Sequence, residues 1–126
     1  MGLITYKPTT PSFRKTVKID KSVLFKGRPE KNLIEELQPS SGRNNIGKIT
    51  IRHRSGGHKK KYRIINFKRN TFDKIGTVER IEYDPNRSAF IALIDYQDLK
   101  EYIIAPSDIK SGDKVISSSK TEISSG

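Results

Sequence analysis

A long stretch without acidic residues most constrains what this chain can fold into. Between Glu36 and Asp73 the sequence contains ten lysines and arginines and no aspartate or glutamate. The whole chain carries a formal net charge of +11, so this stretch holds nearly all of the excess. A solvated surface normally mixes both signs, because like charges repel one another unless phosphate neutralises them. The stretch therefore predicts a nucleic-acid interface rather than an ordinary charged face.

Composition excludes several other classes of protein. Only 33% of the 126 residues are apolar, so any hydrophobic core is small. The chain has no cysteine, which excludes a disulfide scaffold, a zinc ribbon and thiol chemistry. No apolar run approaches the roughly 18 residues that a membrane helix needs, so we expect no membrane partner.

Catalytic and metal sites are equally unsupported. His53 and His58 have no cysteine or nearby acid to complete a ligand set, so we expect no protein-bound metal. The basic stretch lacks the carboxylates of two-metal nucleic-acid chemistry, and no nucleophile with its base can be recognised. We therefore expect a protein without enzymatic activity and without a cofactor, apart from magnesium ions that accompany bound RNA.

The second half of the chain has the alternation of short β-strands. A small closed or sandwich β fold is predicted, because strand-like runs recur with turn signals between them. A bulge is expected near Glu79 and Arg80, where strict alternation cannot be kept. A tight turn is expected over 84–87, with Pro85 at its second position. The expected strands are 48–52, 61–69, 76–84, 88–96, 100–106 and 114–117. The expected core residues are Val78, Ile81, Tyr83, Phe90, Ala92, Ile94, Tyr102 and Ile104.

The first 42 residues look poorly able to fold alone, because they are rich in lysine, threonine, serine and proline. One short helix is expected at about 30–37, with Pro29 near its first turn and Pro39 ending it. In that helix Leu33, Ile34 and Leu37 would share one face and anchor the arm.

The basic stretch combines residue types that suit RNA. Its arginines supply planar forks for phosphates or bases, its lysines supply point charges, and its asparagines can pair with base edges or ribose hydroxyls. Its histidines can stack on unpaired bases. Its glycines either allow a close backbone approach to phosphate or are only turn residues, and both readings stay open at Ser55-Gly56-Gly57.

Long ordered motifs resemble one known family. The run from 41 to 70, SGRNNIGKITIRHRSGGHKKKYRIINFKRN, is followed by VERIEYDPNRSAFIALIDY (78–96) and EYIIAPSDIKSGDKV (101–115). Together with KPTTPSFR (7–14) and GRPEKNLIEEL (27–37), these segments resemble the bacterial-type large ribosomal subunit protein two. Ser55 stands where the family usually has the first of three glycines, and Phe67 stands where an aspartate is commoner.

The resemblance implies an all-β fold with a long extended N-terminal arm and a small five-stranded OB-like barrel. The expected units are an extended basic RNA-binding arm at 1–60, an OB-like RNA-binding barrel at 61–118 and a linker at 119–126. It also implies direct binding to large-subunit ribosomal RNA, near the peptidyl transferase centre and the region of subunit association. With the chemistry above, the predicted RNA-binding residues are Lys7, Arg14, Lys15, Arg43, Asn44, Asn45, Lys48, Arg52, His53, Arg54, Gly56, Gly57, His58, Lys59, Lys60, Lys61, Arg63, Lys68, Arg69, Asn70, Asn86 and Arg87.

The family continues into an SH3-like barrel that the 126 residues do not contain. Either the protein is naturally split, with the second barrel on a separate partner chain, or the chain is truncated. The first alternative leads us to expect a mitochondrial rather than a bacterial ribosome. Besides ribosomal RNA and a separate second-half chain, neighbouring ribosomal proteins are expected partners. The competing hypothesis is a free-standing single-strand binder, which would need aromatic side chains exposed across its strands.

Overall fold

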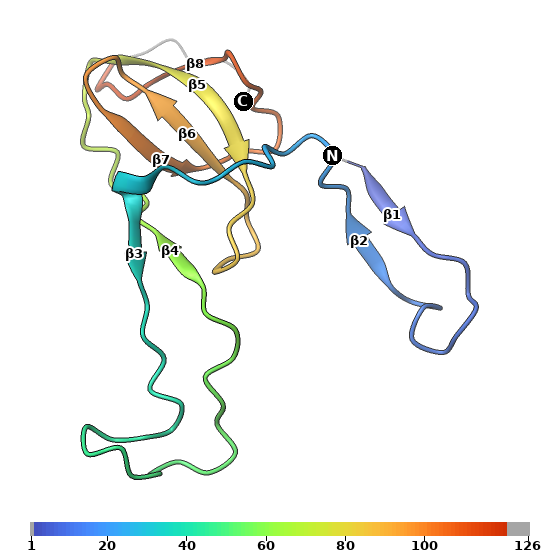
Figure 1. Cartoon of the computed structure of the whole chain (residues 1–126). Helices are drawn as coiled ribbons and strands as arrows, with labels where there is room; N and C mark the ends of the chain where they lie inside the picture. Colours follow the sequence, from blue (N-terminus) through green and yellow to red (C-terminus); the bar gives the residue numbers. More distant parts are fainter. Residues whose placement is uncertain (1, 121–126) are drawn as a thin grey trace.

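The protein is all-β, and its strands form three separate antiparallel sheets (Figure 1). A computed structural model describes residues 2–120 of the chain. The central sheet has the strand order β7-β6-β5-β8, and the two other sheets are two-stranded, β1-β2 and β3-β4. In chain order the elements are β1 (Leu3–Thr5), β2 (Val17–Ile19), the 3-10 turn η1 (Lys31–Leu33), β3 (Ile34–Glu36), β4 (Lys61–Arg63), β5 (Ile75–Glu82), β6 (Ile91–Asp95), β7 (Lys100–Ile104) and β8 (Lys114–Ile116).

The central sheet is the OB-like part of the molecule. Beside its four strands, two isolated bridges add segments from earlier in the chain, Phe25 to Glu82 and Ile65 to Tyr102, both parallel. The β5–β6 register shifts between Val78 and Arg80, which confirms the predicted bulge. The linker predicted at 119–126 lies outside the described residues, apart from its first two.

The core lies on both faces of β6. One cluster contains Val78, Ala92 and Ile94, together with Tyr96 and Ile103. The other cluster, on the opposite face of β6, consists of Ile65, Ile91, Leu93 and Tyr102. Four consecutive residues of β6 are therefore buried, because the segments before β5 cover the second face of the sheet.

The predicted core was partly correct. Val78, Phe90, Ala92, Ile94 and Tyr102 are buried, and Ile81 is half-buried. Tyr83 and Ile104 were predicted wrongly, because they are 44% and 43% exposed. Alternation assigns one face of a strand to the solvent, so it missed Ile91 and Leu93 on β6, which is covered on both sides. The other buried apolar residues that were not predicted are Leu24, Ile65, Tyr96 and Ile103.

The helix predicted at 30–37 does not form. Only the 3-10 turn at Lys31–Leu33 is helical, and the chain then continues as β3. Ile34 pairs with Arg63 of β4, and the Leu33 carbonyl accepts a hydrogen bond from Ile64 N–H at 3.0 Å. Pairing with a distant strand satisfies backbone groups that a two-turn helix would largely leave unpaired, and it places Leu33 against the second core cluster.

Two of the predicted strands differ strongly from the structure, whereas those predicted at 76–84, 88–96 and 100–106 form but end or begin a few residues inside the predicted bounds. Residues 48–52 are not a strand: Ile49 makes only an isolated bridge with Arg43, and Ile51 begins a turn. The run 61–69 is a strand only as far as Arg63, after which the chain crosses to Tyr102. The apolar side chains of 48–52 find no sheet to cover, and Ile49 and Ile51 remain exposed.

Candidate nucleic-acid interface

The connection between β3 and β4 projects away from the central sheet as a long two-legged loop (Figure 1). We call residues 37–60 the basic finger. The finger contains no acidic residue. Its six lysines and arginines are all exposed to solvent, namely Arg43, Lys48, Arg52, Arg54, Lys59 and Lys60. Folding therefore gathers most of the acid-free stretch on one projection instead of spreading it over the barrel.

The finger is ordered by its own backbone. Gly42 has a φ of +69°, and its carbonyl accepts hydrogen bonds from the Thr50 and Ile51 N–H groups at 2.9 and 3.1 Å. The Thr50 hydroxyl donates to the same carbonyl at 3.3 Å. A Cβ at position 42 would meet the Ile51 carbonyl oxygen, so glycine is required both by the backbone conformation and by this close approach. The loop that carries Arg43 and Arg52 is thus shaped before any ligand binds.

Some predicted RNA-binding residues are committed to this loop. The side-chain oxygen of Asn44 accepts from the Ile46 and Lys48 N–H groups at 3.1 and 2.9 Å, which closes the turn at the tip of the finger. Asn45 lies exposed in that turn, next to Ile46, which is 75% exposed. Asn44 therefore has a structural role, while its amide nitrogen stays available to a ligand.

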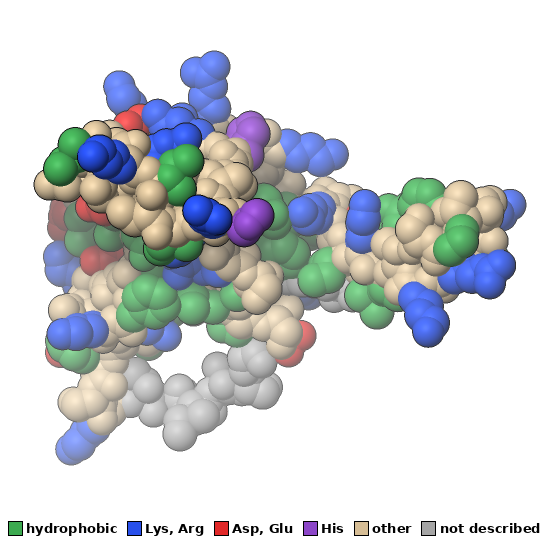
Figure 2. All heavy atoms as spheres, turned by 90° about the horizontal axis from the view of Figure 1, so that it is seen from below, with side chains coloured by type: hydrophobic (Ala, Val, Ile, Leu, Met, Phe, Trp, Pro, Cys, Tyr) green, Lys and Arg blue, Asp and Glu red, His purple; other side chains and the backbone are tan. Residues whose placement is uncertain are grey.

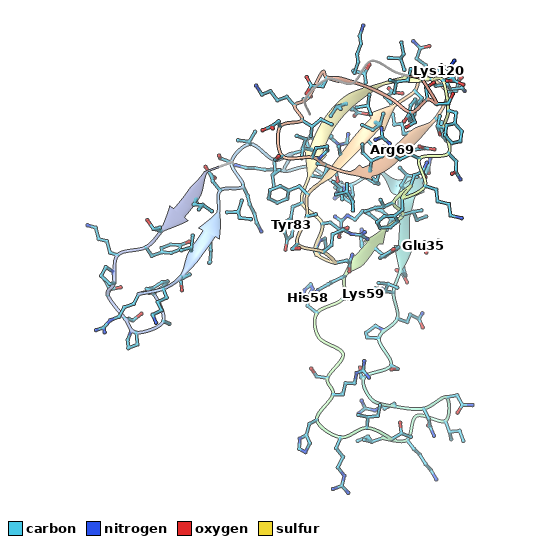
Figure 3. The ribbon with its side chains drawn as sticks, turned by 180° about the vertical axis from the view of Figure 1, so that it is seen from behind. Glu35, His58, Lys59, Arg69, Tyr83 and Lys120 are labelled. Atoms are coloured by element: carbon cyan, nitrogen blue, oxygen red, sulfur yellow. The ribbon has the colours of Figure 1, made fainter. Side chains whose placement is uncertain are left out.

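Gly56 and Gly57 lie in the part of the finger that leads to β4, and the backbone geometry there accounts for both glycines. Gly56 lies against Ser41, and a Cβ there would meet the serine hydroxyl. Gly57 has a φ of +65°, a conformation that residues with a Cβ rarely adopt. His58 follows with its Nδ1 hydrogen-bonded to the Lys59 carbonyl at 2.9 Å, and Figure 3 shows both side chains near the base of the finger. Backbone geometry therefore favours glycine at both positions, although residues 54–57 form an irregular stretch of the finger and not a turn.

Lys59 differs from the other cations of the finger. Its Nζ lies 3.1 Å from a carboxylate oxygen of Glu36, the last residue of β3. Both side chains are mostly exposed, so this ion pair contributes little to stability and a phosphate could replace the carboxylate.

A second projection carries Lys7, Arg14 and Lys15. These exposed residues lie in the connection between β1 and β2. The hairpin 3–19 buries none of its strand residues. Tyr6 contacts Phe13, at 5.4 Å between ring centroids, and the Lys18 Nζ lies 5.5 Å from the centroid of the Tyr6 ring. Figure 2 shows basic side chains projecting from both the hairpin and the finger, on one side of the molecule. A two-stranded hairpin is marginally stable alone, so this projection needs a partner surface to hold it.

The predicted residues on the barrel fall into two groups. Lys61, Lys68 and Asn70 are exposed, like the residues of the finger. Arg63 and Arg69 are partly buried, and the Arg63 Nη1 donates to the Lys61 carbonyl at 3.0 Å. Arg69 lies in the barrel, well away from the finger (Figure 3).

The turn at 84–87 forms as predicted, but its asparagine and arginine are turned inward. The fully buried carboxylate of Asp84 accepts from the Arg87 Nε at 2.8 Å and from the Asn86 N–H at 2.8 Å. Asn86 also donates to the Lys61 carbonyl at 2.8 Å, and the Arg87 guanidinium lies 5.5 Å from the ring centroid of Tyr62. These two residues join the turn to β4, so their contacts are primarily structural.

Sequence patterns missed one component of the finger surface. Ile46, Ile49 and Ile51 lie among the arginines and are 75%, 63% and 51% exposed. Alternation assigned two of them to a strand face. The signal that could have found them is the set of flanking glycines at 42, 47, 56 and 57, which interrupts any strand pairing. In the described residues, no group of three or more His, Cys, Asp or Glu could hold a metal ion, and no helix is long and apolar enough to cross a membrane.

The finger and the barrel together match one known family. The profile described as "Ribosomal Proteins L2, RNA binding N-terminal domain" matches residues 30–117. The chain belongs to the ribosomal protein L2 family. This finding confirms the resemblance that the motifs of the sequence indicated.

Curated relatives agree along the whole chain. The large ribosomal subunit protein uL2 of Ruegeria pomeroyi is 59% identical over 127 residues, covering 100% of this chain and 45% of the relative. The uL2 of Rhizobium etli is 59% identical over 121 residues, covering 95% of this chain and 44% of the relative. That of Gluconobacter oxydans is 56% identical over 127 residues, covering 100% and 46%. The chain spans less than half the length of the curated relatives it matches.

The residues matched by the L2 family profile include one of the two projections and not the other. The basic finger lies inside the matched residues 30–117, whereas the hairpin 3–19 lies before them. The relatives from Ruegeria and Gluconobacter nevertheless align over the whole chain, so the hairpin belongs to the shared part of the L2 sequence.

Proposed function

We infer that this chain is a structural constituent of the large ribosomal subunit and binds large-subunit ribosomal RNA through the basic finger. One observation carries the proposal: the finger is an ordered projection with six exposed cations and no acid, in a member of the L2 family. Clustered exposed cations on a preformed loop suit the phosphate backbone of RNA, and the exposed isoleucines suit the faces of unstacked bases. The protein is then a binding and scaffolding component of translation, not an enzyme.

The hairpin supplies a second contact. Its basic connection with Lys7, Arg14 and Lys15 projects separately from the finger, so two RNA segments can be held by one barrel. Contact with RNA offsets the entropy of ordering a hairpin that buries no strand residue of its own.

A salt titration tests the proposal. The 126-residue chain is bound to a large-subunit ribosomal RNA fragment in a filter assay at increasing salt. The logarithm of affinity should fall linearly with the logarithm of salt, with a slope of about −0.7 to −0.9 for each phosphate contacted. A flat response would contradict RNA binding through the finger.

A paired substitution tests the finger itself. The double variant Arg52→Ala/Arg54→Ala should bind the same RNA more weakly and show a smaller salt slope, with unchanged circular dichroism. The matched control Lys74→Ala/Lys110→Ala removes two exposed cations on the barrel and should bind like the original protein. Equal losses in both variants would show that only net charge matters.

The finer parts of the proposal concern the place of the protein in the subunit. We place the bound RNA near the peptidyl transferase centre and the region of subunit association. Hydroxyl-radical footprinting of large-subunit RNA should then show protections in these two regions. Protections confined to other regions would contradict this placement.

Neighbouring ribosomal proteins are the proposed protein partners. The relatives are more than twice as long as this chain. Cross-linking and mass spectrometry of the natural large subunit should detect peptides of neighbouring ribosomal proteins joined to this chain, and an absence of such peptides would contradict the proposal. The relatives are bacterial and give no support to a mitochondrial source, so they favour the bacterial cytoplasm.

The alternative is a free-standing single-strand binder. It is favoured by Phe67 and Phe72, which are 63% and 62% exposed beside the barrel. Such a protein would bind unrelated single strands with affinities similar to that for ribosomal RNA, so a comparison of three unrelated oligonucleotides separates the two functions.

A further inference from the structure

The barrel contains a cavity that no residue of the basic finger lines. Its volume is about 540 Å³, and its wall includes Ile103 of β7 and Val115 of β8. These are the two edge strands of the central sheet, and the connection 105–113 between them forms another part of the wall. Cavities of roughly 300–1,000 Å³ are the usual size for small-molecule sites.

Apolar side chains form much of this cavity. Ile65 and Ile103 are 8% and 4% exposed and belong to the two core clusters. Ile109 and Val115 are partly buried against the first cluster. A flat ring can lie against such a surface without losing hydrogen bonds to water at its faces.

One guanidinium in the wall has unused hydrogen-bond donors. The Nε and Nη2 atoms of Arg69 are buried and have no hydrogen-bond partner among residues 2–120. Buried donors are normally paired, and the fork of an arginine fits a phosphate with two parallel hydrogen bonds. Arg69 lines the cavity, and an anionic group there would satisfy both covered atoms after a rotation of the arginine side chain.

The loop that carries Arg69 is held in place. The Arg69 N–H donates to the Asn66 side-chain oxygen at 2.8 Å, and the Asn66 amide donates to Glu101 at 2.9 Å. The Thr71 hydroxyl donates to the other oxygen of Glu101 at 2.9 Å. Glu101 of β7 therefore holds the loop 66–71 in place through hydrogen bonds to Asn66 and Thr71. The backbone that carries the Arg69 guanidinium is fixed as a result.

Two carboxylates also line the cavity. The carboxylate of Asp113 accepts from the Lys110 N–H at 2.7 Å and so stabilises its own turn. Asp108 is exposed, and its carboxylate makes no hydrogen bond or ion pair within the described part of the chain. A free carboxylate accepts hydrogen bonds from the exocyclic amino group of a base, as it does from cytosine.

We propose that this cavity binds one unpaired nucleotide with an amino-bearing base. Its phosphate pairs with Arg69, its base lies on Ile103 and Val115, and its amino group donates to Asp108. The proposal rests on the RNA-binding function above, because the nucleotide belongs to the bound RNA. Proteins that read RNA by sequence commonly take unstacked bases into such sites.

Mononucleotides test the cavity without any larger RNA. The isotope-labelled full chain is titrated with CMP, UMP and inorganic phosphate and followed by NMR. CMP should shift the amide signals of Ile103, Ile109 and Val115 and the Arg69 Nε–H signal, and it should bind more tightly than UMP. Phosphate alone should shift the Arg69 signal and leave the isoleucine signals unchanged. CMP that shifts none of these four signals would overturn the proposal.

Substitutions distinguish binding in the cavity from nonspecific attraction of the nucleotide to the positive charge of the protein. Arg69→Gln should weaken CMP binding about tenfold or more, since hydrogen bonds to a charged group are lost. The control Lys110→Gln removes an exposed cation of the connection 105–113 and should change CMP binding little. Asp108→Asn should abolish the preference for CMP over UMP. Equal losses in Arg69→Gln and Lys110→Gln would overturn the proposal.

Thermal unfolding provides a second readout. Because the two buried donors have no partner in the described residues, Arg69→Gln should melt at or above the temperature of the original protein. A large drop would mean that Arg69 stabilises the fold and would overturn the assignment. If ribosomal RNA binds but CMP does not enter, the cavity proposal fails alone. If CMP enters but ribosomal RNA does not bind, the proposed function fails alone.

Discussion

Tyr102 donates its phenolic proton to the buried carboxylate of Glu82 across 3.1 Å. The same hydroxyl oxygen accepts a hydrogen bond from the Glu30 N–H at 2.9 Å. Tyr102 is fully buried, and the Glu82 carboxylate also accepts a hydrogen bond from the Arg80 Nε at 2.7 Å. This chain of contacts fastens the segment before β3 to the central sheet, and through it positions the first leg of the basic finger.

The Tyr102 hydroxyl is therefore expected to stabilise the fold. Tyr102→Phe leaves the Glu30 N–H without its acceptor and removes one of the two hydrogen bonds that Glu82 accepts, so the free energy of unfolding should fall by about 1–3 kcal/mol. Urea denaturation measures the change. Tyr83→Phe is the control, because Tyr83 is 44% exposed and its contact with Lys21 is made through the ring, so stability should stay within about 0.5 kcal/mol. Similar losses in both variants would contradict this role.

Stability should also depend on pH at the alkaline end. Burial raises the pKa of Tyr102 to about 12, whereas an unfolded tyrosine has a pKa of about 10. Above pH 10 the unfolded chain loses this proton first, so the free energy of unfolding should fall as the pH rises towards 12. Denaturation at pH values from about 9 to 12 measures the fall, and it should be smaller in Tyr102→Phe. A fall of equal size in that variant would assign the effect to other groups, among them Tyr96, whose pKa burial also raises.

Two predicted RNA-binding residues should behave in opposite ways. Arg87→Met leaves the buried Asp84 carboxylate without its charged partner, so unfolding should require about 3–5 kcal/mol less. Lys59→Met breaks only an exposed pair and should change stability by less than about 0.5 kcal/mol. In the RNA assay, Lys59→Met should instead reduce the salt slope by about 1. Urea denaturation and the salt titration together distinguish the two roles, and a stable Arg87→Met would contradict the inward-facing geometry.

The shape of the finger should matter as well as its charge. Gly42→Ala places a methyl group against the Ile51 carbonyl oxygen and should open the loop closed by Thr50 and Ile51. Gly47→Ala is the matched control, because φ is also positive there, at +82°, but a Cβ meets nothing within 4 Å. Hydrogen exchange of the Thr50 and Ile51 amides should accelerate only in Gly42→Ala, which should also bind ribosomal RNA several-fold more weakly. Equal exchange in both variants would show that the loop does not depend on Gly42.

Local patterns were sufficient for the second half of the barrel. The runs around β5, β6, β7 and β8 alternate over short distances, and these strands pair mostly with neighbours in the chain, so their existence and the bulge could be predicted. The basic stretch could also be recognised, because its charge does not depend on folding. The prediction failed where a segment pairs far along the chain, as Ile34 does with Arg63. The local sequence of 30–37 favours a short helix and a strand about equally, so pairing with β4 decides which of the two forms.

The sequence by itself determined the charge of this protein, its family and the positions of its local turns, because residue identity and near-neighbour sterics are sufficient for these. Only the tertiary structure decided which cations face solvent and which are used internally. Arg52 and Arg54 are exposed on the finger, whereas Arg87 pairs with a buried carboxylate and Arg69 lines a cavity. The four have the same side chain. Their different roles come from burial and from partners that the fold brings together from distant parts of the chain.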